Sequence, residues 1–387
     1  MDFTYPADVQ EFRVEFRRYL DSIATSDLMD ELRIGGNWGG KHTKRLWQKL
    51  GEDGYFGLGW PKEYGGGGKS LLYLHAFNYE MAYRRFPVPV VTLNTVGPTL
   101  IRIGSEEQKK QYLPKILKGE IEFAIGYTEP DAGTDLASLQ TSAVRDGDEY
   151  VINGQKVFTS GAHHADYLWL AVRTDPDAPK HKGISILIVP LDSEGIEVAP
   201  LNIMGGGRSN ITYYTDVRVP VSAIVGEENL GWRYITTQLD FERIAISPIA
   251  QLERVFDWLC DCARDGRLDA SEAWTGSTLV RMAADVNALK VMDMKLASMV
   301  ANGEVPVHEA SLLKVLSNEF RVTFSGEVLQ MLGSIGLVRR ESPGAQLDSS
   351  DDAIERQLRE STILLFGGGS NDVQRDIIAT HGLGLPR

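Results

Sequence analysis

The sequence has only two cysteines, Cys260 and Cys262, among its 387 residues. They lie two positions apart on a segment with helical periodicity, so their side chains point to different sides and cannot readily form a disulfide with each other. No other metal-ligating side chains are spaced around them, which argues against a zinc site. The pair predicts buried or neutral thiols in a reducing compartment.

Long runs of basic or apolar residues are also missing. The net charge is −13, from 40 basic and 53 acidic residues, and no Lys/Arg run offers a surface for nucleic acid or an anionic membrane. The longest apolar run, residues 184–190, is of strand length and far shorter than a membrane span. Residues 1–4 have neither the basic nor the apolar region of a signal peptide. These absences predict a cytoplasmic protein that binds neither nucleic acid nor membrane.

No Gly-x-Gly-x-x-Gly motif follows a predicted strand, which argues against a nicotinamide site of the Rossmann type. Residues 68–70 (Gly-Lys-Ser) resemble the end of a phosphate-binding loop. That motif requires glycine at the position of Glu63 and a buried strand before it, and neither is present. Ser70 is therefore predicted to begin a helix. Ser105 is predicted to begin another, because Gln108 three residues later completes a capping box.

The spacing of apolar residues divides the chain into three parts. Residues 1–120 have the 3.6-residue period of helices, residues 121–235 contain short stretches with the two-residue period of strands, and residues 236–387 return to the helical period. Many short strands with short turns predict an antiparallel barrel or sandwich. The sequence therefore predicts an α+β fold with an N-terminal helical domain, a middle β domain and a C-terminal four-helix bundle.

Turn residues set the boundaries of the predicted strands. Asp146-Gly147 and Asn153-Gly154 are dipeptides typical of tight hairpins, so each is predicted to separate two strands. The predicted strands are 123–127, 140–145, 149–153, 155–159, 167–173, 184–190, 196–202 and 211–219.

Two apolar stripes define helices in the C-terminal part. Apolar residues recur at steps of three and four from 282 to 299 and again from 313 to 328. Gly303 is predicted to end the first helix and Pro306 to precede the second. We interpret the methionines and phenylalanines of these stripes as core residues rather than ligand-binding residues.

The loop 127–135 combines several features of a ligand-binding turn. Pro130 fixes its own φ angle, and Gly133 permits a positive φ or a close backbone approach. Thr128 and Thr134 add hydroxyl donors. Such a loop could lay backbone N–H groups against a planar polar ligand, although an ordinary turn at the end of a strand has a similar composition.

Six motifs carry a resemblance to a known family. They are WPKEYGG at 60–66, YTEPDAGTD at 127–135, NGQKVFTS at 153–160, VRVP at 217–220 followed by GEEN at 226–229 and GW at 231–232, QMLGS at 330–334, and GGGSNDVQR at 367–375. Their order and spacing resemble the acyl-CoA dehydrogenase family, and most closely its actinobacterial steroid side-chain subgroup. The resemblance implies an oxidoreductase that acts on acyl-CoA thioesters with bound FAD.

The resemblance also assigns residues to the two ligands. The cofactor-binding residues that it implies are Tyr127, Thr128, Gly133, Thr134, Phe158, Ser160, Gln330, Ser334, Ser370 and Asp372. Phe158 stands where the family usually has a tryptophan against the flavin ring, and Ser160 where it usually has a threonine. The substrate-binding residues that it implies are Thr134, Asp240, Arg243 and Gly368.

The reaction of the family requires a carboxylate base, because a weakly acidic C–H beside the thioester must lose its proton while hydride leaves the next carbon. Most members supply this base from the C-terminal motif, where the present chain has Gly368. Some members carry it on the first helix after the β domain, and Glu242 occupies the matching position. The resemblance thus implies Glu242 as the base, whereas most single glutamates are solvated surface residues.

Glycine at position 368 also removes side-chain volume near the acyl group. Its backbone N–H remains able to donate to the thioester carbonyl. We therefore expect a bulky or branched acyl group. The subgroup resemblance implies a steroid ring system on a short acyl-CoA chain.

A second departure from the family concerns assembly. Homotetrameric members have an Arg-x-x-Phe-Gly motif whose arginine reaches the flavin pyrophosphate of a neighbouring subunit, and residues 263–271 lack it. Either Arg264 or Arg267 replaces that arginine or another chain provides it, because a pyrophosphate in a partly buried site needs cationic or N–H partners. The subgroup resemblance implies a heterotetramer with two copies of each of two homologous chains. A homotetramer is the alternative. The family also implies an electron-transfer flavoprotein or a similar electron acceptor.

Two other function classes fit parts of the sequence. Flavin oxidases and monooxygenases share the fold, and a subunit that has lost its base could support a catalytic partner. Glu242 favours catalysis, whereas the altered flavin motifs favour the supporting role. The pair His163-His164 has no third metal ligand spaced near it, and we interpret it as a hydrogen-bonded edge near the pocket mouth.

Overall fold

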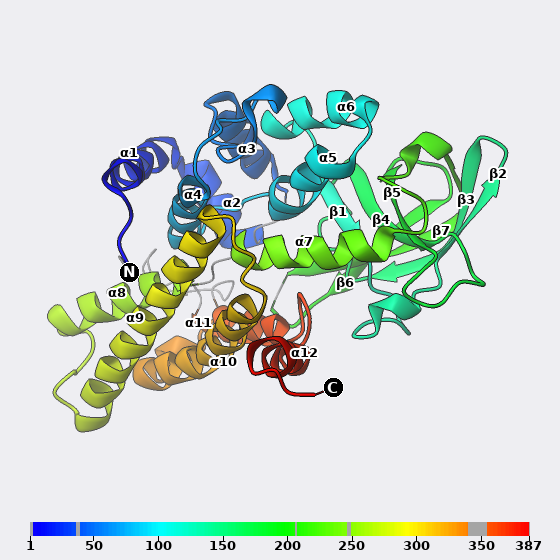
Figure 1. Ribbon diagram of the computed structural model, residues 1–387. Coiled ribbons are helices and arrows are strands. Elements are labelled where there is room, and N and C mark those ends of the chain that lie inside the picture. The colour runs from blue at the N-terminus through cyan, green and yellow to red at the C-terminus, as the bar shows by residue number, and fades with distance from the viewer. Residues whose placement is uncertain (1–2, 36–38, 206, 246–248, 340–353, 387) are drawn as a thin grey trace.

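The computed structural model of the protein describes residues 3–35, 39–205, 207–245, 249–339 and 354–386, without the side chains of 33–35, 239–245 and 335. In Figure 1 the N-terminal and C-terminal helices lie together, and the sheet extends from them at one end of the molecule. The predicted fold class is confirmed, because helices are followed by a mainly antiparallel sheet and then by a helical bundle.

The N-terminal part is helical and packs around aromatic side chains. Its elements are α1 Ala7–Ile23, α2 Ser26–Gly35, α3 Lys41–Glu52, η1 Lys62–Tyr64, α4 Leu71–Tyr83, η2 Val91–Val96, α5 Gly97–Ile103 and α6 Glu106–Leu117. Phe16 on α1 and Phe77 on α4 are both buried, with ring centroids 5.2 Å apart. This contact lies at the centre of the packing between the two helices.

Two predicted helix starts are confirmed by their caps. The Ser70 hydroxyl accepts a hydrogen bond from the N–H of Leu72 at the start of α4. At α6, the Ser105 hydroxyl accepts from the N–H of Gln108 (3.1 Å), and the Gln108 side chain accepts from the N–H of Ser105 (3.2 Å). Each cap satisfies backbone donors that a helix start leaves without an intrahelical partner.

The middle part is a seven-stranded sheet. Its strands are β1 Phe123–Gly126, β2 Ser142–Asp146, β3 Glu149–Val157, β4 Tyr167–Arg173, β5 Ile184–Pro190, β6 Ile196–Asn202 and β7 Arg208–Pro220. The order across the sheet is β1-β4-β2-β3-β7-β6, and β5 pairs with β4. Most pairings are antiparallel, but β4 pairs in parallel with β1 and β2. The periodicity of the sequence could not reveal these two parallel pairings, because it carries no information on strand direction.

The prediction of a hairpin at Asn153-Gly154 is wrong. Strand β3 continues through this dipeptide and pairs antiparallel with β7 on both sides of it, with a shift of register at this point. Gly154 has a φ of +143°, and a Cβ there would lie 2.8 Å from Thr141 Cα. The dipeptide therefore forms a β-bulge, which bends the strand without reversing it. The hairpin at Asp146-Gly147 is confirmed by the pairing of β2 with β3.

The C-terminal part is a helical bundle, preceded by the short helix η4 Val221–Ala223. Its elements are α7 Gly231–Ala245, α8 Ile249–Arg264, α9 Ala273–Ala301, α10 Val307–Leu332, η5 Ile335–Leu337, α11 Ile354–Ser361, η6 Thr362–Leu365, α12 Asn371–Ile377 and η7 Ile378–Gly382. The core includes Met282, Leu289 and Leu296 of α9 and Leu313, Phe324 and Val328 of α10, as the stripes predict. Gly303 follows α9 with a φ of +82°, and Pro306 directly precedes α10, both as predicted.

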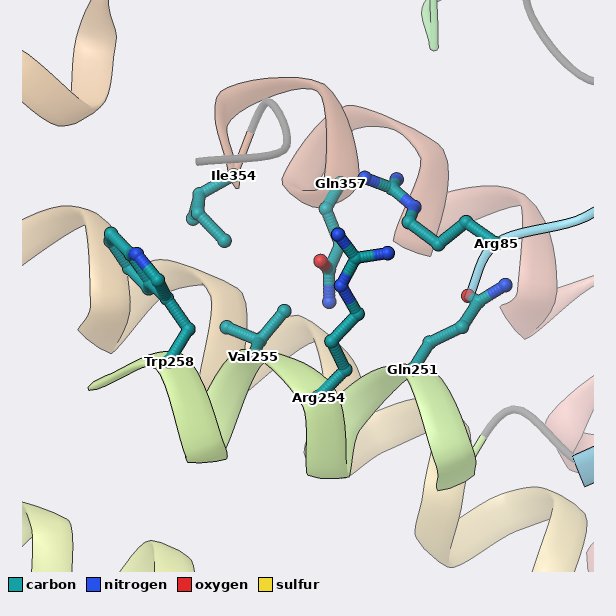
Figure 2. Close-up of a pocket in the computed structure, with 7 residues that line it drawn as sticks. All are labelled: Arg85, Gln251, Arg254, Val255, Trp258, Ile354 and Gln357. Atoms are coloured by element: carbon teal, nitrogen blue, oxygen red, sulfur yellow. The ribbon is translucent and has the colours of Figure 1, made fainter. Parts of the chain in front are cut away.

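Helix α8 carries the two cysteines and borders a small recess. Neither forms a disulfide, and Cys262 is buried whereas Cys260 is half-buried. Figure 2 shows the recess between α8, α11 and Arg85, which is two residues beyond the end of α4; it is lined by Arg85, Gln251, Arg254, Val255, Trp258, Ile354 and Gln357. Its volume of about 10 Å³ suffices for no more than one water molecule. This recess is therefore too small for a flavin ring or an acyl chain.

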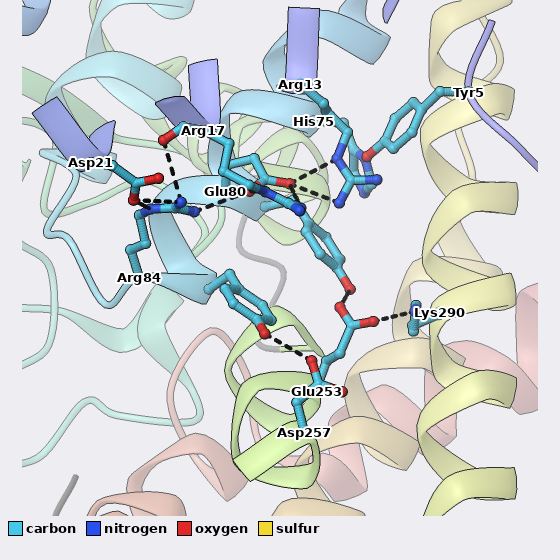
Figure 3. Close-up of polar contacts among 12 residues, drawn as sticks. Tyr5, Arg13, Arg17, Asp21, His75, Glu80, Arg84, Glu253, Asp257 and Lys290 are labelled. Carbon is cyan, nitrogen blue, oxygen red and sulfur yellow. Dashed lines mark hydrogen bonds and ion pairs between the residues drawn. The ribbon is translucent and has the colours of Figure 1, made fainter. Parts of the chain in front are cut away.

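A network of ion pairs joins the N-terminal helices to the bundle (Figure 3). Glu80 on α4 accepts two hydrogen bonds from Arg17 of α1, at 2.9 and 3.0 Å. Burial raises the pKa of Glu80, but the neighbouring arginines outweigh it and hold the pKa below its usual value. Glu253 on α8 binds both Tyr79 of α4 and Lys290 of α9. Because a buried charge without its partner is costly, these pairs fix α4 against its neighbours.

Candidate flavin and acyl-CoA site

A buried ion pair ties the loop 127–135 to strand β3. The Lys156 ammonium has no exposed surface and lies 2.7 Å from Glu129 Oε1. It also donates to the carbonyl of Tyr127 at 3.1 Å. Glu129 accepts in addition from the N–H groups of residues 140–141, at 2.7 and 2.8 Å. One carboxylate thus binds the loop both to the segment that follows it and to the strand beside it.

Burial and charge act against each other in this pair. Burial lowers the pKa of Lys156 to about 8, although the Glu129 carboxylate opposes the change. Burial raises the pKa of Glu129, but the ammonium and the hydrogen bonds to the carboxylate outweigh it and hold that pKa below 4.5. Both groups therefore carry their charges at pH 7.

Tyr127 joins this loop to helix α7. Its hydroxyl donates to Gln238 Oε1 at 2.6 Å and accepts from the indole N–H of Trp169 on β4 at 3.1 Å. The three side chains are buried. The Tyr127 side chain therefore fixes α7 against the sheet.

The second flavin motif leaves β3 directly beside the same loop. The N–H of Val157 donates to the carbonyl of Thr128 at 2.8 Å. The next residue, Phe158, has a φ of +60° and is 58% exposed. This conformation costs a non-glycine residue about 1–2 kcal/mol and is most common at functional positions. An exposed aromatic ring held in this way fits a planar aromatic ligand.

Strand β7 fixes the residues after Phe158. The carbonyl of Asn210 accepts from the N–H of Thr159 at 3.0 Å, and the Asn210 side chain donates to the carbonyl of Thr159 at 2.9 Å. The Ser160 hydroxyl lies 3.0 Å from the Ser209 hydroxyl. Ser160 is thus held in place at the end of the motif by a neighbouring strand.

The two histidines after this motif are hydrogen-bonded. His163 Nδ1 lies 3.2 Å from the Asn210 side-chain nitrogen, and His164 Nδ1 lies 2.8 Å from Glu122 Oε2. Burial, with the positive charge of neighbouring side chains, lowers the pKa of His163 to about 4, so this imidazole is neutral at pH 7. Within the described part of the chain, no cluster of three His, Cys, Asp or Glu side chains could hold a metal ion.

The outer part of the loop 127–135 is open. Thr128 is half-buried, whereas Gly133 and Thr134 are exposed. Gly133 is not among the residues with a positive φ, and the nearest heavy atom to an added Cβ would be a Thr128 methyl carbon at 4.0 Å. The glycine therefore provides space for a ligand rather than an unusual backbone conformation.

The residues predicted from the last C-terminal motif lie around the start of α12. Gly368 lies in the turn between η6 and α12, with a φ of +68° and no heavy atom within 4 Å of an added Cβ. The Ser370 hydroxyl caps α12 by accepting from the N–H of Val373 at 3.3 Å. Asp372 is exposed in the first turn of that helix.

Gln330 and Ser334 lie elsewhere, at and just beyond the C-terminal end of α10, and both are exposed. Asn318 on the same helix donates to the carbonyl of Leu364 in η6 at 2.7 Å. It precedes Gln330 by twelve residues, which corresponds to about 18 Å along a helix. Within one chain, therefore, Gln330 and the turn at Gly368 cannot contact the same group of ligand atoms.

The proposed base lies on α7. Glu242, Asp240 and Arg243 belong to the last turns of this helix, and their side chains lie outside the described residues. The described backbone places Glu242 one helical turn after Gln238, the residue that α7 uses to bind Tyr127.

The two arginines considered for a flavin pyrophosphate pair with acidic residues of their own segment. Arg264 Nη1 lies 2.6 Å from Asp261 Oδ1, and Arg267 Nε lies 2.9 Å from Asp265 Oδ2. Both pairs are on the surface. Each guanidinium thus pairs, at the surface, with a carboxylate of its own segment.

The sequence reasoning missed the ion pair that holds the two flavin motifs together. The sequence contained one indication that Lys156 is buried. Lys156 follows the buried Tyr150 and Ile152 at even steps along the strand, so its side chain lies on the face that points inward. A charge at such a position requires a buried partner. Gln238 carried no comparable signal, since a single glutamine on an amphipathic helix is usually exposed.

Family models match three consecutive parts of the chain. The N-terminal domain of acyl-CoA dehydrogenases matches residues 7–120, the middle domain 124–216 and the C-terminal domain 229–383. The chain therefore belongs to the acyl-CoA dehydrogenase family and is an oxidoreductase of that family. Among the described helices, none is long and apolar enough to cross a membrane.

Full-length relatives confirm the resemblance to the steroid-related subgroup. The acyl-CoA dehydrogenase FadE26 of Mycobacterium tuberculosis is 44% identical over 402 residues, which cover 100% of this chain and 99% of the relative. The solved structure of the Tcur3481–Tcur3483 steroid ACAD matches with a TM-score of 0.94 and 46% identity over 100% of both chains. That of the ChsE4–ChsE5 complex from Mycobacterium tuberculosis matches with a TM-score of 0.91 and 41% identity, also over 100% of both chains.

Proposed function

We propose that the protein catalyses the FAD-dependent α,β-dehydrogenation of an acyl-CoA thioester with Glu242 as the base. The observation that carries this proposal is the junction of the two flavin motifs. Lys156 on the second motif binds Glu129 and Tyr127 on the first, and Phe158 leaves this junction with an exposed ring. Membership of the acyl-CoA dehydrogenase family supports the reaction.

The residues at this junction fit FAD. Phe158 would lie against the flavin ring, and the hydroxyls of Thr128, Thr134 and Ser160 are donors for its polar edge. When bound, FAD supplies the acceptor for the hydride. Gln330, Ser334, Ser370 and Asp372 would hold the remaining parts of FAD, some of them in a neighbouring subunit because of their separation along α10.

Residues of the chain itself would remove the α-proton and stabilise the resulting charge. Glu242 takes the proton, which requires a carboxylate that is partly withdrawn from water. The N–H of Gly368 donates to the thioester oxygen, on which negative charge develops. Asp240 and Arg243 contact the CoA chain.

Anaerobic titration of the purified protein tests this function. A yellow protein whose flavin band bleaches on addition of a bulky acyl-CoA, and recovers slowly in air, is expected. Rapid recovery in air would favour a flavin oxidase or monooxygenase. A protein that binds no flavin, or whose flavin resists every thioester, would contradict the proposal and favour a supporting subunit.

We further propose that the acyl group carries a steroid ring system. The open space at Gly368 accommodates bulk, and the solved relative named a steroid ACAD supports this substrate class. The parental enzyme is expected to convert steroid-bearing thioesters faster than octanoyl-CoA. Faster conversion of octanoyl-CoA would refute the substrate assignment.

The substitution Gly368→Ala is expected to lower kcat/KM for a steroid-bearing thioester by about tenfold more than for octanoyl-CoA. The left-handed φ should lower the stability of the fold by about 1–2 kcal/mol whichever substrate is used, whereas the added methyl group should obstruct only the bulky one. Gly303→Ala is the matched control, because Gly303 also has a positive φ and open space but lies between α9 and α10. An unchanged substrate ratio in Gly368→Ala would contradict the role of the glycine.

We also propose that a second, homologous chain completes the flavin site and that an electron-transfer flavoprotein or similar acceptor reoxidises it. Arg264 and Arg267 each pair with a carboxylate of their own segment, and the related ChsE4–ChsE5 structure is named as a complex. The chain purified alone is expected to hold less than one FAD per chain. Co-expression with the product of the neighbouring gene should give a heterotetramer that binds FAD tightly. A chain that alone binds one FAD and turns over substrate would show that no partner is needed.

A further inference from the structure

The glycine turn before α12 is held by three side chains, two from α10 and one from α12. Asn318 donates to the carbonyl of Leu364 at 2.7 Å, and Lys314, one turn earlier on α10, donates to the same carbonyl at 3.2 Å. Lys314 also donates to the carbonyl of Gly369 and to the side chain of Asn371 at 3.3 Å. The half-buried ammonium of Lys314 therefore binds both ends of the turn.

A third donor holds the middle of the turn. The side chain of Gln374, which is fully buried on α12, donates to the carbonyl of Gly368 at 3.4 Å. A Cβ on Gly369 would lie 2.7 Å from this side-chain nitrogen, so only glycine allows this approach. Gly368 and Gly369 both have a positive φ, +68° and +91°. The backbone of the turn is thus kept in a conformation that other residues rarely adopt.

The direction of these bonds decides where the N–H groups of the turn point. In a trans peptide the carbonyl and the following N–H point to opposite sides. Because Gln374 holds the carbonyl of Gly368, the N–H of Gly369 points away from α12. The opposite side of the turn is open, since an added Cβ on Gly368 would meet no heavy atom within 4 Å. Phe366, just before the glycines, is 70% exposed.

We propose that Lys314 is a positioning residue for the thioester, acting with Asn318 through the glycine turn. By holding the carbonyls of Leu364 and Gly369 against α10, it fixes both ends of the turn, so that the N–H groups between them, at Gly368 and Gly369, keep their direction toward the carbonyl oxygen of the acyl-CoA. This inference rests on the proposed function, because it requires a thioester beside the turn.

The substitution Lys314→Met in the complete holoenzyme tests the inference. It keeps the length of the side chain and removes its donors and charge. We expect flavin reduction by the acyl-CoA to slow by about tenfold to a hundredfold. This decrease in rate is no larger than the decrease that follows removal of an oxyanion donor itself. KM and flavin content should change little. Lys314→Arg, which keeps the charge and the donors, should recover most of the rate.

A spectroscopic readout separates positioning from a structural role. A conjugated aryl-acryloyl-CoA is the probe, because its absorption band moves to longer wavelength when its thioester carbonyl is polarised. The parental holoenzyme should shift this band, Lys314→Met should lose most of the shift, and Lys290→Met, which removes a lysine that binds Glu253 away from the turn, should keep it.

The outcomes for the two proposals differ. A parental enzyme that neither shifts the band nor is reduced by thioesters overturns the proposed function. A parental enzyme that shifts the band, with the same shift in Lys314→Met, overturns only the role of Lys314. If Lys314→Met does not fold, Asn318→Ala replaces it. Loss of part of the shift in that variant supports the inference, and a full shift overturns it.

Discussion

The substitution Glu242→Gln is expected to slow flavin reduction by an acyl-CoA thioester by about two to four orders of magnitude. Glutamine keeps the size of the side chain and one acceptor oxygen, but it cannot take up the α-proton at neutral pH. Binding of FAD and of the thioester should therefore remain close to parental. The effect should appear in the rate of reduction at saturating substrate rather than in KM.

The expected loss is large because the chain offers no second carboxylate at the position that most members use. Gly368 stands there, and its backbone lies in an open turn with no side chain to accept a proton. Any residual rate in the variant would come from orientation of the thioester and from the N–H donors of the turn. Those contributions survive the substitution because they depend on backbone groups.

Stopped-flow reduction under anaerobic conditions measures the effect directly, since the flavin band reports the transfer of the hydride. Glu197→Gln is the matched control, because Glu197 is an exposed glutamate on β6. It should reduce its flavin at the parental rate. A folded, flavin-loaded Glu242→Gln protein that also does so would remove Glu242 from the mechanism.

The fold could be predicted from the sequence where the spacing of apolar residues or a helix-capping residue indicated the element directly. The Ser105–Gln108 capping box and the stripes of α9 and α10 are local patterns, and the structure contains them as predicted. The hairpin prediction at Asn153-Gly154 was wrong because a hairpin and a β-bulge both contain a glycine with an unusual φ. Only the strand that pairs with this segment decides which of the two forms. That partner, β7, lies about sixty residues further along the chain.

The site was predictable as a set of motifs but not as an arrangement. The loop 127–135 and the segment after β3 stood out by composition, yet their connection through Lys156 depends on a contact between distant residues. No pattern in the sequence indicated that Lys314 binds the glycine turn, because a single lysine on a helix is usually solvated. Periodicity describes which face of an element is buried and leaves open what that face meets.

Loss of the buried lysine at the flavin junction is expected to be the most damaging substitution for stability. Lys156→Met should lower the free energy of unfolding by about 3–5 kcal/mol, because it leaves the Glu129 carboxylate buried without its counter-charge. Methionine fills most of the space of the lysine stem, so lost packing contributes little. The melting temperature of the variant and its retention of FAD, followed by release of flavin fluorescence on heating, measure the effect.

The matched control is a lysine that pairs with the same loop. Lys180 pairs with Asp135 at 2.8 Å, but both side chains are more than half exposed. Such a pair contributes at most about 1 kcal/mol, so Lys180→Met should leave the melting temperature almost unchanged. Equal decreases in the melting temperature of Lys156→Met and Lys180→Met would show that burial does not set the strength of the Lys156 pair.

Removing the orphaned charge should recover much of the loss. In the double variant Lys156→Met with Glu129→Gln, the single amide oxygen can still accept from one of the two N–H groups of residues 140–141, which bind different oxygens of the carboxylate, and no unpaired charge remains. The pH dependence should follow the same logic. The pKa of Glu129 is lower in the folded protein than its usual 4.5, so its contribution to stability is complete above that pH and is lost as the pH falls through the folded value. The free energy of unfolding, measured between neutral and acid pH, should therefore decline less steeply in the double variant than in the parent. Parallel curves would show that Glu129 is not held as an ion in the folded protein.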